Sequence, residues 1–554
     1  MLATYHTVRK SILLAFLVLS CAACDLENPK EQFESADWII TNGQVITVDK
    51  DFSIHQAIAI KDGLVLKTGT SAEISALADD KTKRTNLQGK TIIPGLIDNH
   101  IHFVRAAKYW SRMVRWDDVK LRSAAIKRLK KKEASLPKGE WLLVLGGFRF
   151  DQFGDDESEF TLAELNQIIP NRPLYIQQDY ATAFANSLAL TAAGVDNTTK
   201  VKGTGDFIKD AKGNLTGKLT FQAMDVIYAA FSEPTPEMWK KSLHQAVDSL
   251  LSSGLTTVYD LGGNTVTKDY YKVVANCAAA DSLRLRVFYS LNGQNSTMSS
   301  PKEIINGLKA TRPNLKNLTY SQFGYGETIY APMRGQPFIV SDEEKQHFQN
   351  IVSTAVEYGW QLHEHTMREP KLKLMLDLVD SIAAENLALK EQRFTIAHTN
   401  GISPMSIQRA IDMDMVFAVH SVSRLLDNIP TPPVQTIHEM GGIWGLGSDA
   451  TVVASPNPFH TLGWVVSGIN IKGSKNLEDT VTREEALRAH TATNAYILFK
   501  ENHLGSLEEG KQADFVVLDE NYMDIPAQDI AKLRADMTVI EGKIVFQKLN
   551  PNSF

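Results

Sequence analysis

The sequence predicts an α/β protein in which helices wrap a parallel sheet and strand-rich segments stand at both ends of the chain. Through the middle of the sequence, short apolar segments of strand length alternate with longer helical patterns, which is typical of parallel sheets. From residue 38 onward, apolar and polar residues alternate around the turn pairs Asn42-Gly43 and Asp62-Gly63, which predicts hairpin strands. The same pattern returns at residues 513–518 and 539–546, so we expect further strands there.

The composition indicates a folded protein of more than one domain. The chain has 554 residues, of which 43% are hydrophobic and 22% are charged, and this is ample for a large core. Its formal net charge is −6, whereas domains that bind nucleic acid carry clustered positive charge. We therefore expect no nucleic acid as a partner.

The first residues predict an export signal. Arg9 and Lys10 precede an apolar run over residues 12–19, which is too short to span a bilayer but suits a secretory signal peptide. Small residues precede Cys21 and Cys24, and both positions resemble the lipidation site of bacterial lipoproteins. We expect a lipid on one of these two cysteines, with an ordinary cleaved signal as the alternative.

This signal sets the expected location. Residues 1–24 would be the signal peptide and residues 25–36 a polar tether, so the protein would be exported to the bacterial cell envelope and anchored to a membrane, facing the periplasm. Beyond the signal, Cys277 is the only cysteine in the sequence, which excludes a disulfide framework.

Residues 94–102 carry the most informative motif. They read PGLIDNHIH, and a strand that ends in His-x-His presents His100 and His102 on one face. Two neutral imidazoles side by side suit zinc or a similar divalent ion. A half-buried strand with two unrelated histidines is the alternative.

The flanking residues carry a family resemblance. Residues 89–102, GKTIIPGLIDNHIH, resemble the first barrel strand of the amidohydrolase superfamily of metal-dependent hydrolases. Residues 505–519, GSLEEGKQADFVVLD, resemble the segment by which that family re-enters its β domain. Three short stretches between residues 161 and 190 are similar to the insertion of the YtcJ-like subgroup. The resemblance runs from about residue 38 to 547.

This resemblance implies a (β/α)8 barrel of the TIM type over residues 94–504 and a β-sandwich composed of residues 37–93 and 505–549. The stretch from about 104 to 245 is too long for one barrel connection and is expected to be an insertion after the first strand. By their motifs, strands two to eight are expected at residues 254–260, 283–287, 320–324, 360–365, 394–398, 416–420 and 445–450.

The resemblance also implies the ligands of a divalent metal, which we expect to be zinc. Each candidate stands at the carboxyl end of a predicted strand, the end at which barrel enzymes build their sites. The expected ligands are His100, His102, His365, His398 and Asp449. His398 could instead be a core histidine, and Asp449 could cap the following helix.

Two further histidines lie on the same strands. His363 shares a face with His365, so we expect it to fill a barrel layer through a hydrogen bond. His420 ends the seventh strand and is expected to contact the substrate, with a structural role as the alternative.

The chain departs from the family in its fourth strand. Members with two metals have a carboxylated lysine in this strand, followed by an aspartate. Here the lysine position holds Ser321 and the aspartate position holds Tyr325. We therefore expect one tight metal, bound by His100, His102, His365 and Asp449. Glu327 lies beyond the predicted strand end, and we expect it to contact substrate. A role as the carboxylate that bridges to a second ion is the alternative.

These residues predict hydrolysis of a non-peptide C–N bond in a small amide, N-acyl or carbamate-like molecule. A divalent ion supplies hydroxide at neutral pH. Asp449 would act as general base and acid, and His398 or His420 would stabilise the oxyanion.

Two alternatives remain. A mononuclear deaminase would lack the lysine, but it usually has a glutamate where this chain has Arg368, with Glu369 one residue later. A non-catalytic binding protein on this scaffold is the other alternative. The expected partners are a small-molecule substrate and the membrane, and an oligomer is left open.

Overall fold

The structure is a computed structural model that describes residues 35–263, 266–292, 300–334 and 339–548. The predicted signal peptide, including Cys21 and Cys24, lies outside these residues. Within them, every helix is too short or too polar to cross a lipid bilayer.

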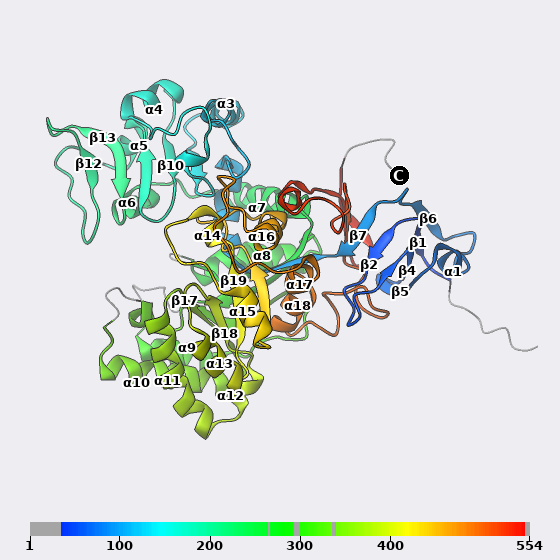
Figure 1. Ribbon diagram of the computed structural model, residues 1–554. Coiled ribbons are helices and arrows are strands. Elements are labelled where there is room, and N and C mark those ends of the chain that lie inside the picture. Colours follow the sequence, from blue (N-terminus) through cyan, green and yellow to red (C-terminus); the bar gives the residue numbers. More distant parts are fainter. Residues whose placement is uncertain (1–34, 264–265, 293–299, 335–338, 549–554) are drawn as a thin grey trace, which may run out of the picture.

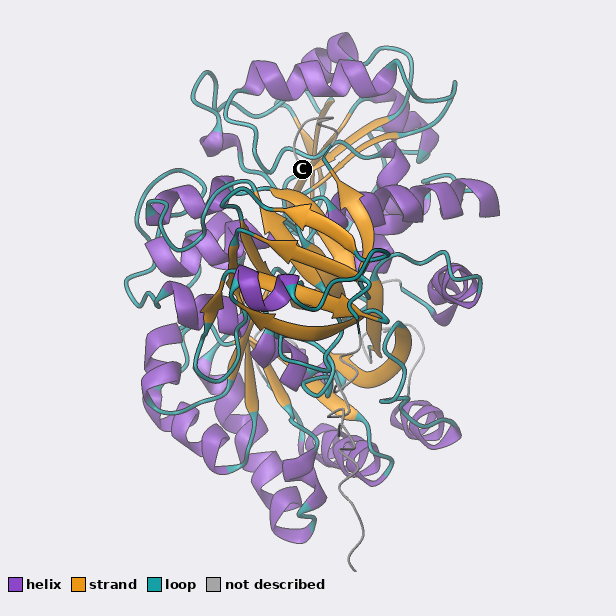
Figure 2. Ribbon diagram, turned by 90° about the vertical axis from the view of Figure 1, so that its right-hand side faces the viewer, coloured by secondary structure: helices purple, strands orange, loops and turns teal. Residues whose placement is uncertain are grey.

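Eight parallel strands form the central barrel, and helices surround it (Figures 1 and 2). Each strand pairs with the next along the chain, as in a (β/α)8 barrel, so the expected fold is confirmed. The first and last strands meet where Asp449 N–H donates to the His100 carbonyl at 2.8 Å and His102 N–H donates to the Ala450 carbonyl at 2.8 Å. The strands are β8 (Leu96–Ile101), β14 (Leu255–Asp260), β15 (Arg286–Leu291), β16 (Tyr320–Glu327), β17 (Gln361–Thr366), β18 (Thr395–His398), β19 (Val416–His420) and β20 (Trp444–Gly447).

Helices with recognisable starts cover the barrel. The hydroxyls of Ser300 and Ser341 each accept a hydrogen bond from the backbone N–H three residues later. In return, the carboxylates of Glu303 and Glu344 accept from the backbone N–H of these serines, which completes two capping boxes. The helices of this layer are α2 (Phe103–Tyr109), α7 (Pro236–Leu251), α8 (Lys268–Ala279), α9 (Pro301–Ala310), α10 (Asp342–Glu357), α11 (Glu369–Glu385), α12 (Ala388–Glu391), α13 (Pro404–Asp412), α14 (Val422–Leu425), α15 (Val434–Glu439), α16 (Pro458–Ser467), α17 (Arg483–Ala489) and α18 (Ala492–Ile497).

Strands from both ends of the chain form a β-sandwich beside the barrel (Figure 1). Its sheets have the orders β5-β4-β1-β6 and β23-β22-β21-β7-β2-β3, and they bury a shared core that includes Trp38 and Phe515. The elements are β1 (Trp38–Thr41), β2 (Gln44–Ile46), β3 (Ile54–His55), β4 (Ala57–Lys61), β5 (Leu64–Gly69), α1 (Ser71–Ser75), β6 (Lys83–Asn86), β7 (Thr91–Pro94), β21 (Phe515–Leu518), β22 (Ala535–Ile540) and β23 (Lys543–Gln547).

The insertion forms a separate layer with its own sheet, in the order β12-β13-β11-β10-β9 (Figure 1). Its aromatic core includes Trp116 and Phe148, whose ring centroids are 4.7 Å apart. It docks on the loop after β20, where Arg115 Nη1 donates to the Thr451 carbonyl at 2.9 Å. The elements are α3 (Arg122–Glu133), β9 (Leu142–Leu145), α4 (Leu162–Ile168), β10 (Leu174–Gln177), β11 (Thr182–Ala185), α5 (Ser187–Ala192), β12 (Phe207–Lys209), β13 (Leu215–Thr220) and α6 (Ala223–Ala229).

A buried ion pair joins the barrel to the sandwich. Arg286 in β15 donates from Nε and Nη2 to the two carboxylate oxygens of Asp514, at 2.7 and 3.0 Å. Both side chains are almost fully buried. Such a fork holds the two domains in one orientation, because neither charge can be left unpaired at low cost.

We predict that Arg286→Met destabilises the protein by about 3–5 kcal/mol, because it leaves the Asp514 carboxylate buried without its partner. Urea unfolding followed by fluorescence would measure this. Arg284→Met is the control, since its guanidinium pairs with Asp248 on the surface and should contribute less than about 1 kcal/mol. Equal losses in the two variants would contradict the prediction.

Candidate metal centre

Four histidines and a glutamate from the barrel strands converge with Asp449 and His420 at one end of the barrel. His100 is in β8 and His102 directly follows it, Glu327 ends β16, His365 is in β17, His398 ends β18 and His420 ends β19. Asp449 comes two residues after β20. The structure thus brings together all the site residues that the sequence predicted.

The ligand atoms fall into three overlapping groups, two of which share Glu327. One group contains His100, His102 and Glu327, and another contains Glu327, His365 and His398. A third possible group joins His100, His398, His420 and Asp449. The expected combination of His365 with His100, His102 and Asp449 differs from this geometry, because His365 lies on the far side of Glu327.

The two carboxylate oxygens of Glu327 face different histidines. Oε2 lies 3.5 Å from His102 Nε2 and 3.9 Å from His100 Nε2. Oε1 contacts His365 Nδ1 and lies 3.3 Å from His398 Nε2. This is the arrangement of a carboxylate that bridges two adjoining cation sites.

The expectation that Glu327 lies beyond the strand end was wrong. β16 extends to Glu327, which pairs with Glu364 of β17, and its side chain is 3% exposed. Ser321 is the second residue of β16 and lies near its opposite end. Glu327, and not Ser321, therefore stands at the carboxyl end of β16 among the histidines.

The backbone of β16 is irregular over the residues that precede Glu327. The ladder to β15 pairs Tyr289 with Gln322 and then Ser290 with Gly324, so one residue is skipped and the inside-outside alternation shifts. Gly326 has φ +130°, and a Cβ there would lie 1.8 Å from the His363 carbonyl oxygen. Only glycine permits this close approach.

Asp449 faces the same centre. Its Oδ1 lies 3.0 Å from His102 Nε2, and its Oδ2 lies 3.8 Å from His398 Nδ1. The helix that follows is capped by Asn457, which excludes the helix-capping alternative for Asp449. The carboxylate is therefore directed at the histidines.

His363 contacts the cluster from behind. Its Nε2 lies 3.1 Å from His100 Nδ1, so it makes a hydrogen bond in the barrel layer, as expected. When His100 binds a metal through Nε2, its Nδ1 carries the proton and donates a hydrogen bond to His363 Nε2. His363 therefore orients a ligand without being one.

The charges of the centre suit a bound cation. Burial holds the pKa values of His100, His365 and His420 well below the usual range, and it lowers the pKa of His363 to about 3. Burial raises the pKa of Glu327, but the adjacent His365 and His398 lower it by more. The pKa of Glu327 therefore lies well below its usual range. The neutral imidazoles of His100, His365 and His420 and the charged carboxylate of Glu327 are the protonation states that metal binding requires. Burial lowers the pKa of His102, but the Asp449 and Glu327 carboxylates outweigh this effect, so the pKa of His102 is raised.

Several buried ring nitrogens in the centre have no hydrogen-bond partner among the described residues. They are Nε2 of His100, Nδ1 of His398 and both ring nitrogens of His420. Buried polar atoms in folded proteins normally have partners, so these atoms fit a divalent ion or its ligands. The donor set of imidazoles and carboxylates is one that zinc accepts.

The deaminase alternative loses its proton-transferring residue. Glu369 accepts hydrogen bonds from the Ser403 backbone at 2.8 Å and from the Ser406 hydroxyl at 2.6 Å. These contacts fix the carboxylate at the start of α13, so it is committed to a structural role.

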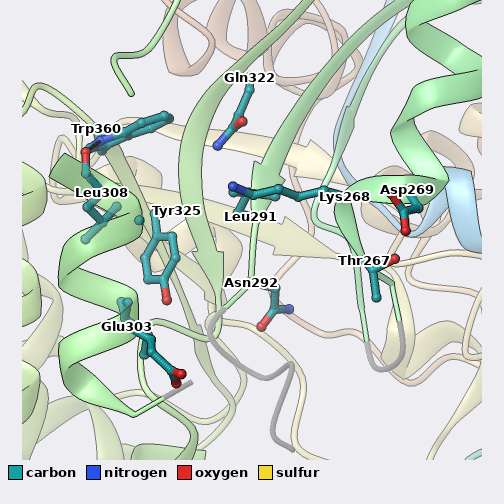
Figure 3. Close-up of a pocket in the computed structure, with 12 residues that line it drawn as sticks. Thr267, Lys268, Asp269, Leu291, Asn292, Glu303, Leu308, Gln322, Tyr325 and Trp360 are labelled. Atoms are coloured by element: carbon teal, nitrogen blue, oxygen red, sulfur yellow. Dashed lines mark hydrogen bonds between the residues drawn. The ribbon is translucent and has the colours of Figure 1, made fainter. Parts of the chain in front are cut away.

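A separate cavity of about 370 Å³ lies outside the barrel strands (Figure 3). Tyr325 and Gln322 of β16, Trp360, and Glu303 of α9 are among its lining residues, and none of the residues of the metal cluster lines it. Tyr325 faces this cavity because the shift in β16 turns it outward, so it is not a residue of the centre.

Sequence reasoning missed Arg105 and Tyr180 at the entrance to the centre. Arg105 Nη2 donates to the Tyr180 hydroxyl at 2.7 Å, and Tyr180 comes from the insertion. The position of Arg105 three residues after His102 was the available signal.

The chain matches the amidohydrolase family over residues 84–546. It is 28% identical to Protein LONG AFTER FAR-RED 3 of Arabidopsis thaliana, covering 90% of this chain and 89% of that protein. It is 23% identical to the N-substituted formamide deformylase of Arthrobacter pascens, covering 92% and 98%. An uncharacterised metal-dependent hydrolase from Pyrococcus horikoshii superposes with a TM-score of 0.64 at 17% identity, covering 88% and 99%.

We predict that His363→Leu weakens metal affinity by about 10- to 100-fold, because His100 loses the acceptor that fixes its tautomer. Competition with a chelator would measure this without any assay of activity. His503→Leu, at an exposed histidine, is the control. Unchanged affinity in His363→Leu would show that this contact does not orient the ligand.

Proposed function

Because the chain belongs to the amidohydrolase family, we propose that it hydrolyses a non-peptide C–N bond in a small amide, N-acyl or carbamate-like molecule, using two divalent ions, expected to be zinc. The observation that carries this proposal is the position of Glu327 between two pairs of histidines. The relative that acts on N-substituted formamides supports the bond type.

The residues divide between two cation sites. His100 and His102 with Oε2 of Glu327 would hold one ion, and His365 and His398 with Oε1 would hold the other. A shared carboxylate offsets the repulsion between two dications, which is the requirement that a bridging lysine meets elsewhere. Ions held there would lower the pKa of bound water to about 7 and would polarise the substrate carbonyl.

Asp449 is placed to move the proton. Its two oxygens reach the His102 side and the His398 side of the centre, at 3.0 and 3.8 Å. It would accept a proton from the attacking water and deliver it to the departing nitrogen.

His420 is placed to meet the substrate oxygen. Its ring centroid lies 4.1 Å from that of His100 and 4.4 Å from that of His398, and its ring nitrogens are free of protein partners within the described residues. An N–H there would donate to the oxyanion as charge develops.

We also propose that the protein is exported and attached to a bacterial membrane through a lipid on Cys21 or Cys24. The short apolar run and the small residues before each cysteine support this proposal. The mass of the mature N-terminal peptide decides between the two cysteines and an unmodified end.

We predict that Glu327→Gln lowers the metal content of dialysed protein from two equivalents toward one, because a neutral amide cannot bridge two dications. Elemental analysis would measure it. Glu303→Gln, an acidic residue of the outer cavity, is the control. A wild-type protein that retains a single equivalent of metal after dialysis would contradict the two-metal proposal.

We predict that Asp449→Asn lowers kcat by about 10²- to 10⁴-fold while metal remains bound, because the amide cannot accept the proton. The assay is a panel of N-acyl amines, N-formyl amines, carbamates and cyclic ureides, read as release of amine. His100→Ala, which should also lose metal, is the comparison. Full activity in Asp449→Asn would refute its role, and no turnover of any panel member by the metal-loaded wild type would refute the proposed function.

A further inference from the structure

Arg105 and Tyr180 form a pair at the entrance to the metal centre. Arg105 is in α2, just after His102, and Tyr180 is in the turn between β10 and β11 of the insertion. Arg105 Nη2 donates to the Tyr180 hydroxyl at 2.7 Å. Tyr180 is 42% exposed, so the pair lies at an opening to solvent.

The guanidinium lies next to a residue of the centre. A Cβ built on Gly263 would lie 3.3 Å from Arg105 Nη1 and also 3.3 Å from His102 Nδ1, so the two side chains border the same small space. The opposite nitrogen of that imidazole, Nε2, lies 3.0 Å from Asp449. A substrate bound at the centre is therefore within reach of Arg105.

The charges of the centre act on the pair. Partial burial raises the pKa of the Tyr180 hydroxyl, Arg105 lowers it, and the carboxylates of Asp449 and Glu327 raise it again. The field of the centre thus reaches the entrance, which agrees with the distances above.

Arg105 has no carboxylate partner among the described residues. The acid beside Tyr180, Asp179, accepts hydrogen bonds from the backbone of Ala181 and Thr182 at 2.8 and 2.9 Å and is used by its own turn. By contrast, Arg115 of the insertion pairs with Asp117. The positive charge of Arg105 is thus available to an anion that enters the site.

The pair offers two kinds of donor to such an anion. The guanidinium uses only Nη2 on Tyr180, so its other N–H groups stay available in a planar fork. Because the Tyr180 oxygen accepts that bond, its own O–H is free to donate. A planar carboxylate can accept from both.

We propose that Arg105 and Tyr180 bind a carboxylate group of the substrate, which makes the substrates N-acyl, N-formyl or carbamoyl compounds that carry an acid. This inference rests on the proposed function, because it names the substrate class of that same centre. A free inorganic anion would use the same donors, and the experiment below separates the two sources.

The test compares compounds that differ only in the acid. N-formyl-4-aminobutyrate and N-butylformamide form one such pair, and their acetyl and carbamate analogues form others. We expect kcat/KM of the metal-loaded wild type to be about tenfold or more higher for the acidic member of each pair. Arg105→Met should remove this preference and leave the neutral member nearly unchanged.

Binding is measured separately from turnover. The methanesulfonamide analogues of the same pair have no carbonyl to hydrolyse, and calorimetry should show about tenfold tighter binding of the acidic one to the wild type but not to Arg105→Met. Tyr180→Phe should lose part of this difference. Arg128→Met is the control, because it removes the same charge from the insertion surface, where Arg128 pairs with Asp118.

Each outcome decides the inference. Equal kcat/KM and equal affinity for both members of every pair would overturn it while leaving the hydrolase function in place. Inorganic phosphate that binds in an Arg105-dependent way, with no preference between the members, would assign the pair to a free anion and overturn it as well. If no compound is hydrolysed, the proposed function fails, and the sulfonamide affinities still test the carboxylate site.

Discussion

The carboxylate of Glu327 is the feature on which the rest of the centre depends. It is buried among the imidazoles, and its two oxygens face separate pairs of histidines. A negative charge at this point offsets the mutual repulsion of the two cations that we propose to bind there. Glu327 ends β16, whose backbone is irregular over its last residues. The close approach of Gly326 to the His363 carbonyl comes directly before Glu327, and the sequence alone does not reveal it.

The closing seam of the barrel fixes the opposite side of the same centre. Asp449 N–H and His102 N–H bond across β8 and β20, and the Asp98 carboxylate accepts from the Ser448 hydroxyl at 2.6 Å. These bonds set the position of Asp449 against His102 before any ligand is present. The insertion contacts the next residues of this loop through Arg115 and places Tyr180 against Arg105.

Much of the site could be predicted from residue type and strand position. His-x-His shares a face because strand side chains alternate, and this placed His100 and His102 correctly at the carboxyl end of β8. The same alternation identified His363 as the inner partner of His365, and the hydrogen bond to His100 agrees. The extent of β16 was predicted wrongly. Placing its end at residue 324 left Glu327 outside the strand, whereas β16 extends to Glu327.

The sequence by itself determined the barrel, the composite sandwich and the identity of the histidines and aspartate that meet at the strand ends. These follow from local pattern and from motifs that each lie within one short segment. Only the tertiary structure decided how the ligands divide around Glu327, which way Tyr325 faces, and that Arg105 meets Tyr180. These contacts join segments that are distant in the chain, and the direction of a side chain changes when a single residue is skipped in one strand. A pattern of residue types does not contain that information, because it depends on where backbones from different segments come to rest against each other.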